Sequence, residues 1–106
     1  MVSYNQFKDM EIRTGKVLQV EEIEGADKLY LITVDIGIET RKIVAGIKPW
    51  YSIQELTGKH VIILANLEPR VIRGIESKGM LLATLADNNL SVLTTDREVP
   101  PGSIVS

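Results

Sequence analysis

The alternation of apolar and polar positions predicts a chain of short β-strands separated by turns. Residues 12–23 form one long stretch with poor alternation, residues 29–36 are rich in branched and aromatic side chains, and residues 60–67 are apolar at nearly every position. Such stretches are typical of strands, and the third is expected to be buried on both faces. Gly15 is expected to mark a bulge or sharp bend in the first strand. Further strands are predicted at 40–45, 79–86 and 90–94.

Two short helices are predicted from their caps. Ser3 is followed three residues later by Gln6, and Ser52 is followed in the same way by Glu55. This spacing lets each pair satisfy two backbone N–H groups at the start of a helix. Gly58 is expected to end the second helix. That helix falls between the third and fourth strands.

The order of the elements predicts an all-β OB-fold. Three strands, a short helix and further strands match a five-stranded Greek-key barrel with a helix between strands 3 and 4. An SH3-like barrel is the main competitor, and the position of the helix favours the OB-fold. The 106 residues suit one domain, 1–106. The N-terminal turn and about thirty C-terminal residues exceed the barrel, so we expect them to cover it or to build a subunit interface.

Composition excludes several classes of protein. Apolar residues make up 44% and charged residues 25% of the chain, as in ordinary globular proteins. No apolar run approaches the roughly 20 residues of a membrane span, and the first residues lack a signal-peptide pattern. The chain has no cysteine, which excludes disulfides and thiolate sites and fits our expectation of a cytoplasmic protein.

Residues for catalysis are scarce. The single histidine, His60, opens an apolar strand and is expected to be structural, because it has no partners for a triad or metal site. The acidic residues between Glu21 and Asp27 lack the spacing of a calcium loop. Gly-rich phosphate loops are absent. We therefore expect no enzymatic activity, no metal and no cofactor.

The net charge of −2 conceals an uneven distribution. Residues 40–80 contain seven basic and three acidic residues, whereas the rest of the chain contains five basic and eleven acidic ones. Charges scattered over a solvated surface are the simpler interpretation. The asymmetry indicates a binding surface only if the basic residues gather on one face.

The segment from Asn66 to Met80 contains most of the candidate chemistry. Arg70 and Arg73 follow a proline, so we expect them to project from a rigid, extended connection. Gly74 and Gly79 are expected to bracket a tight loop that holds Ser77 and Lys78. Guanidinium groups suit phosphate because their planar donors bond two oxygens at once. The alternative for Arg73 is an ion pair with Glu76 or Glu68.

Three other residues of this segment are candidates for contacts with nucleic acid. The side chains of Asn66 and Ser77 suit base edges, ribose hydroxyls or phosphates, and Met80 suits the flat face of a base or sugar. Each has a structural alternative. Asn66 would then bond loop backbone, and Met80 would belong to the barrel core.

These residues resemble the tRNA-binding domain family. The stretches that carry the resemblance are NLEPRVIRGIESKGMLLA, GADKLYLITVDIG and RKIVAGIKPWYSIQELTGK, within residues 7–102. The family includes the C-terminal domain of methionyl-tRNA synthetases, stand-alone tRNA-binding proteins and the OB domain of the endothelial monocyte-activating polypeptide. The resemblance implies an OB-fold that binds the outer corner of tRNA with little sequence preference. It also implies a homodimer formed by the terminal additions.

The resemblance also implies a set of tRNA contacts. Carried over by motif, these are Lys28, Asn66, Arg70, Arg73, Ser77, Lys78 and Met80. Lys42 and Lys48 are added on charge alone. Trp50 departs from the family pattern and is expected to pack against the short helix rather than to stack on a base.

The implied role is that of a non-catalytic accessory. The chain looks like a detached C-terminal domain, or beta subunit, of a methionyl-tRNA synthetase, which would raise tRNA affinity in trans for a catalytic chain. A chaperone-like relative with the same fold is the alternative, in which the site binds peptides. That branch lacks the sequence Ser77-Lys78-Gly79-Met80, which this chain has.

Overall fold

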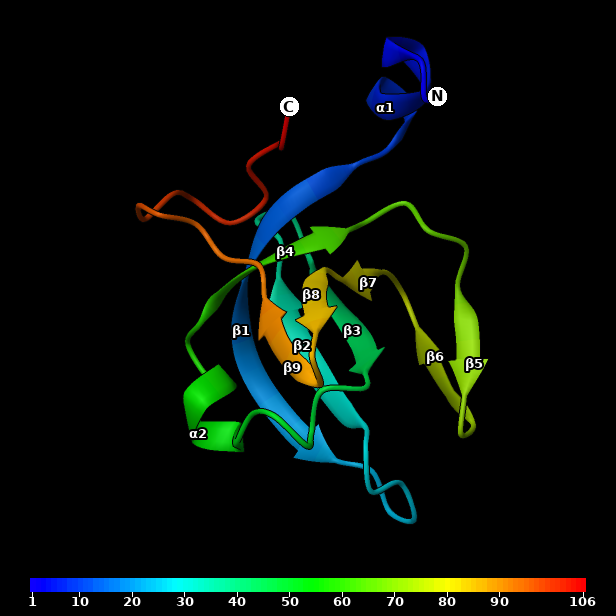
Figure 1. Ribbon diagram of the computed structural model, residues 1–106, viewed down its shortest axis with the longest axis vertical. Helices are drawn as coiled ribbons and strands as arrows, with labels where there is room; N and C mark the ends of the chain where they lie inside the picture. Colours follow the sequence, from blue (N-terminus) through cyan, green and yellow to red (C-terminus); the bar gives the residue numbers. More distant parts are fainter.

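A five-stranded antiparallel sheet, coiled into a barrel, forms the body of the computed structural model, which describes all 106 residues. The sheet order is β3-β2-β1-β4-β7. The strands are β1 (Ile12–Glu22), β2 (Tyr30–Asp35), β3 (Thr40–Ala45), β4 (His60–Leu64) and β7 (Met80–Leu81). Helix α2 (Ile53–Leu56) lies between β3 and β4 in the chain, at one end of the barrel (Figure 1). The predicted OB-fold is therefore confirmed.

The long strand β1 is shared by two neighbours. Its first half pairs with β4, from Ile12 to Lys16, and its second half pairs with β2, from Lys16 to Glu22. The register shifts between Val17 and Gln19, so the bulge predicted at Gly15 was wrongly placed. Gly15 serves close packing instead, because a Cβ there would overlap the side chain of Val34.

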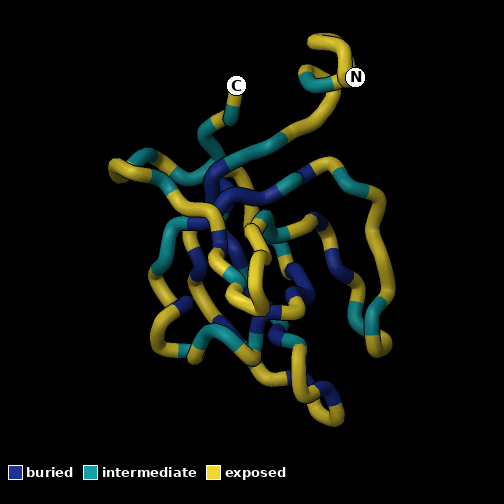
Figure 2. Tube along the Cα trace, in the orientation of Figure 1, coloured by how far each residue is buried: buried dark blue, intermediate teal, exposed yellow.

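The barrel encloses a core of 14 buried residues. Ile32, Ile43, Leu56 and Ile63 are fully buried within it. Strand β4 has three buried residues in succession, Val61 to Ile63, which confirms the predicted burial of both its faces. In Figure 2 the buried positions follow the barrel strands, while the loops and termini are mostly exposed.

Both predicted helix caps are present. Ser3 and Gln6 form a capping box at α1 (Tyr4–Asp9), and Ser52 and Glu55 form another at α2. The hydrogen bonds to Ser52, first of all from its backbone N–H, hold the pKa of Glu55 below its ordinary value. These local contacts fix the helix starts independently of the barrel.

The predicted strand 79–86 is interrupted. Its first part is β7, which pairs with β4, and its second part is β8 (Ala83–Ala86), which pairs with β9 (Asn89–Val92). The chain changes partners at Leu82, whose N–H donates to Ile62 and whose C=O accepts from Leu93. The predicted connection before it also contains a hairpin, β5 (Arg70–Ile72) and β6 (Ile75–Ser77).

The two termini meet at one end of the barrel. The C-terminal residues run beside β1, where Gly102 N–H donates to Thr14 and Val105 N–H donates to Ile12. Helix α1 has no buried residue and projects from the barrel (Figure 1). The structure contains no helix of the length and apolarity needed to span a membrane.

Candidate nucleic-acid interface

The β5–β6 hairpin lies beside the barrel at the right of the view in Figure 1. Ile72 pairs with Ile75, so Arg73 and Gly74 form a two-residue turn. Both have positive φ, 54° and 76°, as a type I′ turn requires. The prediction of a simple extended connection with a tight loop between Gly74 and Gly79 was therefore wrong. Arg73 lies at the tip of a hairpin.

The hairpin is attached to the barrel by apolar and polar contacts. Ile72 and Ile75 pack against a small cluster of Ile23, Ala26 and Val44. The N–H of Val44 donates to the Ser77 hydroxyl over 2.9 Å. One residue further on, Lys78 N–H donates to the Lys42 carbonyl, also over 2.9 Å. These bonds fix the hairpin to the outer edge of β3.

The hairpin and its neighbours gather basic side chains that are far apart in the sequence. Arg73 and Lys28 line one hollow, between the hairpin tip and the β1–β2 loop. Lys42 and Lys78 line a second hollow, between β3 and β6. Arg70 is exposed at the start of β5. We call Lys28, Lys42, Arg70, Arg73 and Lys78 the basic patch.

Most of the basic patch forms no internal ion pair, although Asp27, Glu39 and Glu76 line the same hollows. The structure contains four ion pairs, and none involves Lys28, Lys42, Arg70 or Arg73. The alternative of an ion pair between Arg73 and Glu76 or Glu68 is thus not realised. Lys78 pairs with Glu76 over 3.4 Å, with both side chains about half exposed. Exposed pairs of this kind are weak and are readily exchanged for another anion.

Lys48 lies next to Lys28, since its backbone N–H donates to the Lys28 carbonyl over 3.3 Å, but its side chain is paired. Its ammonium group contacts Glu22 over 2.9 Å. The hydrogen bond that Lys48 donates to Glu22 raises the pKa of Lys48 above its ordinary value. Because its charge is already matched, Lys48 contributes less positive potential than the patch residues.

Two predicted polar contacts are used inside the protein. Ser77 is 4% exposed, and its hydroxyl accepts from Val44. The Asn66 side chain accepts from Glu11 N–H over 2.8 Å and donates to the Asp9 carbonyl over 2.7 Å. Asn66 therefore follows its structural alternative and ties the end of β4 to the segment between α1 and β1.

Met80 and Trp50 lie outside the basic patch. Met80 is 42% exposed and lies at the rim of an apolar groove. The Trp50 indole N–H donates to the Asn88 carbonyl over 3.0 Å, so Trp50 supports the turn between β8 and β9.

Arg41 was not among the predicted contacts, although it lines the same hollow as Lys42 and Lys78. Its guanidinium donates to the Ala65 carbonyl and pairs with Glu39. The adjacent pair Arg41-Lys42 in the basic segment was the available signal. The two neighbours differ in their contacts, since Arg41 is bonded internally and Lys42 has no ion pair.

Comparison with known proteins assigns the barrel and its basic hairpin to one family. The sequence profile described as "Putative tRNA binding domain" matches residues 12–104. The chain belongs to this tRNA-binding domain family. It is 46% identical over 104 residues to a methionine–tRNA ligase of Pyrococcus horikoshii, covering 98% of this chain and 14% of the ligase. The tRNA-binding domain thus spans a small part of that relative.

Solved structures show the same fold. A methionyl-tRNA-synthetase-related protein from Pyrococcus horikoshii superposes with a TM-score of 0.94 at 33% identity, covering 100% of this chain and 98% of the other. A CsaA chaperone protein from Picrophilus torridus superposes with a TM-score of 0.91 at 28% identity, with full coverage of both chains. The fold is thus shared by proteins described as synthetase-related and as chaperones.

Proposed function

We propose that this domain binds tRNA through the basic patch. The observation that carries the proposal is the absence of internal ion pairs at Lys28, Lys42, Arg70 and Arg73. A cluster of cations without ion-pair partners attracts a polyanion even when the net charge of the protein is negative. Phosphates of a folded RNA supply the matching charges.

The arrangement suits recognition of shape more than of sequence. Arginine and lysine contacts to phosphate set position and carry no base information. The patch residues come from three separate parts of the chain, the β1–β2 loop, β3 and the β5–β6 hairpin. A curved or cornered backbone satisfies such a distributed set better than a single straight strand, and this supports the outer corner of tRNA as the bound region.

We further propose an accessory role in the cytoplasm. The similar region in the methionine–tRNA ligases makes up 14% of their length. A separate chain of this kind would raise the affinity of a methionyl-tRNA synthetase catalytic chain for tRNA, without catalysing a reaction itself. Linking tRNA to a second binding surface raises the effective concentration at the first.

A homodimer is proposed from the terminal segments. Tyr4 is 73%, Met10 44% and Ile104 56% exposed, and they lie around one apolar hollow at the same end of the barrel. Helix α1 has six residues and none is buried. Isolated helices of this length are unstable in water. Packing against a second copy of the chain would account for the presence of this helix. Sedimentation or light scattering gives the mass in solution; a monomeric mass contradicts the dimer.

The test of tRNA binding compares two double variants. One lacks two charges of the patch, and the other lacks two charges elsewhere. The variant Arg70→Ala/Arg73→Ala is expected to lose about 1–3 kcal/mol of binding free energy, because two charged phosphate contacts disappear. The control Lys16→Ala/Arg97→Ala changes the net charge equally at exposed sites outside the patch. Filter binding with unfractionated tRNA measures both. Equal affinity of the two variants refutes the patch as the binding surface.

The chaperone-like function is the second candidate, favoured by the superposition on the CsaA protein. It predicts binding of an unfolded polypeptide and indifference to tRNA. Side-by-side titration with tRNA and with a reduced, unfolded protein separates the two functions. The charge variants should affect only the tRNA arm.

A further inference from the structure

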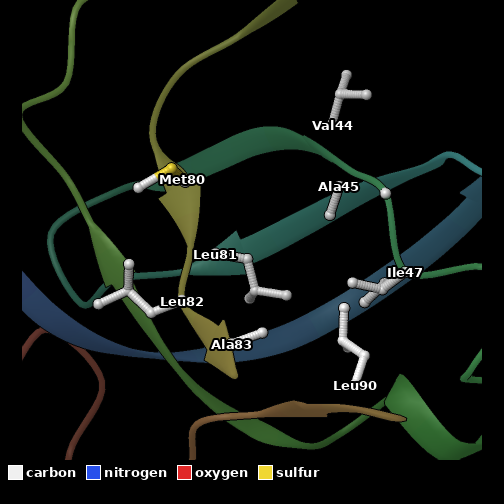
Figure 3. Close-up of a pocket in the computed structure, with 9 residues that line it drawn as sticks. Val44, Ala45, Ile47, Met80, Leu81, Leu82, Ala83 and Leu90 are labelled. Carbon is white, nitrogen blue, oxygen red and sulfur yellow. The ribbon is translucent and has the colours of Figure 1, made fainter. Parts of the chain in front are cut away.

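An apolar groove lies beside the basic patch, where the edge strands of the barrel sheet, β3 and β7, face each other without pairing. The groove has a volume of about 340 Å³, and eight of its nine lining residues are apolar. Figure 3 shows Ile47, Leu81 and Leu90 converging on it from the end of β3, β7 and β9. Its size is at the lower end for small-molecule pockets.

The groove continues directly into the patch. Lys78 precedes Met80, at the rim, by two residues, or about 7 Å of extended chain. Lys78 is bonded through its backbone to Lys42 on β3. A nucleotide whose phosphate meets these lysines therefore has its base within reach of the groove.

The wall of the groove offers polar backbone groups. Gly46 N–H donates no hydrogen bond within the protein. Val44 N–H points away from β2, toward Ser77, and its carbonyl lies on the same side of the strand. An apolar surface edged by a donor and an acceptor matches a nucleobase, which has apolar faces and a polar edge.

An extended peptide fits this edge less well. A peptide that adds to a sheet needs a row of free backbone groups on one strand. On β3, the outward carbonyl of Lys42 and the outward N–H of Val44 are already bonded to Lys78 and Ser77. Strand β7 has only two residues. The free backbone therefore suffices for a compact planar group and not for a strand.

We propose that the groove binds one unpaired base of the bound tRNA, packed between Leu81 and Leu90 over the buried Ile47, with its polar edge toward Gly46. The proposal rests on the proposed function, since the patch delivers the nucleotide. Proteins commonly recognise folded RNA through bases splayed out of loops. The groove would let the domain prefer a tRNA with exposed loop bases over a plain RNA duplex.

The test fills the groove without disturbing the core. Ala83 is exposed and lines the groove, so Ala83→Phe places a ring in it. The control is Thr84→Phe, because neighbouring residues of a strand point to opposite faces and Thr84 is also exposed. Ala83→Phe is expected to weaken tRNA binding about fivefold or more, the lower end of the effect of losing a stacked base. Thr84→Phe should bind like the wild type.

Two further readouts separate a base contact from a phosphate contact. The salt dependence of tRNA binding stays unchanged when only a base contact is lost. Wild type and Ala83→Phe should therefore share one slope of log K against log salt. Binding to a blunt RNA duplex should be equal for both. Thermal unfolding verifies that each variant is folded. If the phenylalanine at position 83 prevents folding, Ala83→Leu replaces Ala83→Phe in the test.

The outcomes distinguish the two proposals. If Ala83→Phe binds tRNA as tightly as Thr84→Phe while Arg70→Ala/Arg73→Ala binds weakly, the base site is refuted and the patch stands. If wild type does not bind tRNA, both proposals fail. If Ala83→Phe no longer binds an unfolded polypeptide but still binds tRNA, the groove is a peptide site and the base proposal is overturned.

Discussion

The barrel and the β5–β6 hairpin use their side chains in opposite ways. The barrel buries 14 residues in one core, whereas the hairpin adds only Ile72 and Ile75 to a cluster of three buried residues. The remaining hairpin side chains, apart from Ser77, face solvent. The barrel thus supplies most of the stability, and the hairpin supplies Arg70 and Arg73 of the basic patch, so substitutions in the barrel core and in the hairpin should affect different measurements.

The largest difference is expected for apolar truncations. Ile63→Ala, at a fully buried site of β4, should lower the free energy of unfolding by about 2–5 kcal/mol. Val71→Ala, at a hairpin site that is 72% exposed, should change it by less than about 0.5 kcal/mol. Urea denaturation followed by circular dichroism measures both. A similar loss for the two variants would show that the hairpin is part of the main core.

Ser77 joins the two regions and should behave as a structural residue. Ser77→Ala leaves the buried N–H of Val44 without its acceptor, which costs about 1–3 kcal/mol of stability. Ser77→Thr, which keeps the hydroxyl, is the matched control. Under conditions where both variants are folded, their tRNA affinities should be close. A Ser77→Ala variant of full stability but weak tRNA binding would instead show a direct contact.

Arg73 should favour binding at the expense of stability. It has φ of 54°, a conformation that costs a side chain with a Cβ roughly 1 kcal/mol relative to glycine. Arg73→Gly should therefore raise the unfolding free energy by up to about 1 kcal/mol and weaken tRNA binding. The control Asn88→Gly, at φ 58° in the other hairpin, should gain less, because asparagine tolerates this conformation. Reduced stability of Arg73→Gly would contradict the strain.

The smallest expected effect is the pH dependence of the α2 cap. The pKa of Glu55 is lowered in the folded protein by its bonds to Ser52, so the unfolded chain takes up the proton first as pH falls. This contribution to stability is complete above the ordinary carboxyl range and is lost as pH falls through it toward the lowered value. Urea midpoints against pH for wild type and Glu55→Gln measure it. The same pH profile for wild type and Glu55→Gln would contradict a stabilising role of the Glu55 carboxylate in the cap.

The sequence was sufficient to predict features that depend on local patterns. The strand at 40–45, the strand predicted at 60–67 and observed at His60–Leu64, and both capping boxes follow from patterns over a few residues. The order of these elements then predicts the OB-fold. The exposed positions of Arg70 and Arg73 follow from their charge.

Features that depend on distant contacts were not predictable. Ser77 bonds a residue 33 positions away, and Asn66 bonds one 55 positions away, so their structural roles have no local signal. The β5–β6 hairpin was missed because its strands have three residues each. Its turn also begins with arginine, where asparagine, aspartate or glycine is usual.

The salt dependence of tRNA affinity tests the central claim most directly. With about three to five phosphate contacts per protomer, log K should fall against log salt with a slope of about −2 to −4. Arg70→Ala/Arg73→Ala should flatten that slope by about 1–2, because two contacts are removed. A slope near zero for wild type, or one left unchanged by the double variant, would contradict tRNA binding through the basic patch.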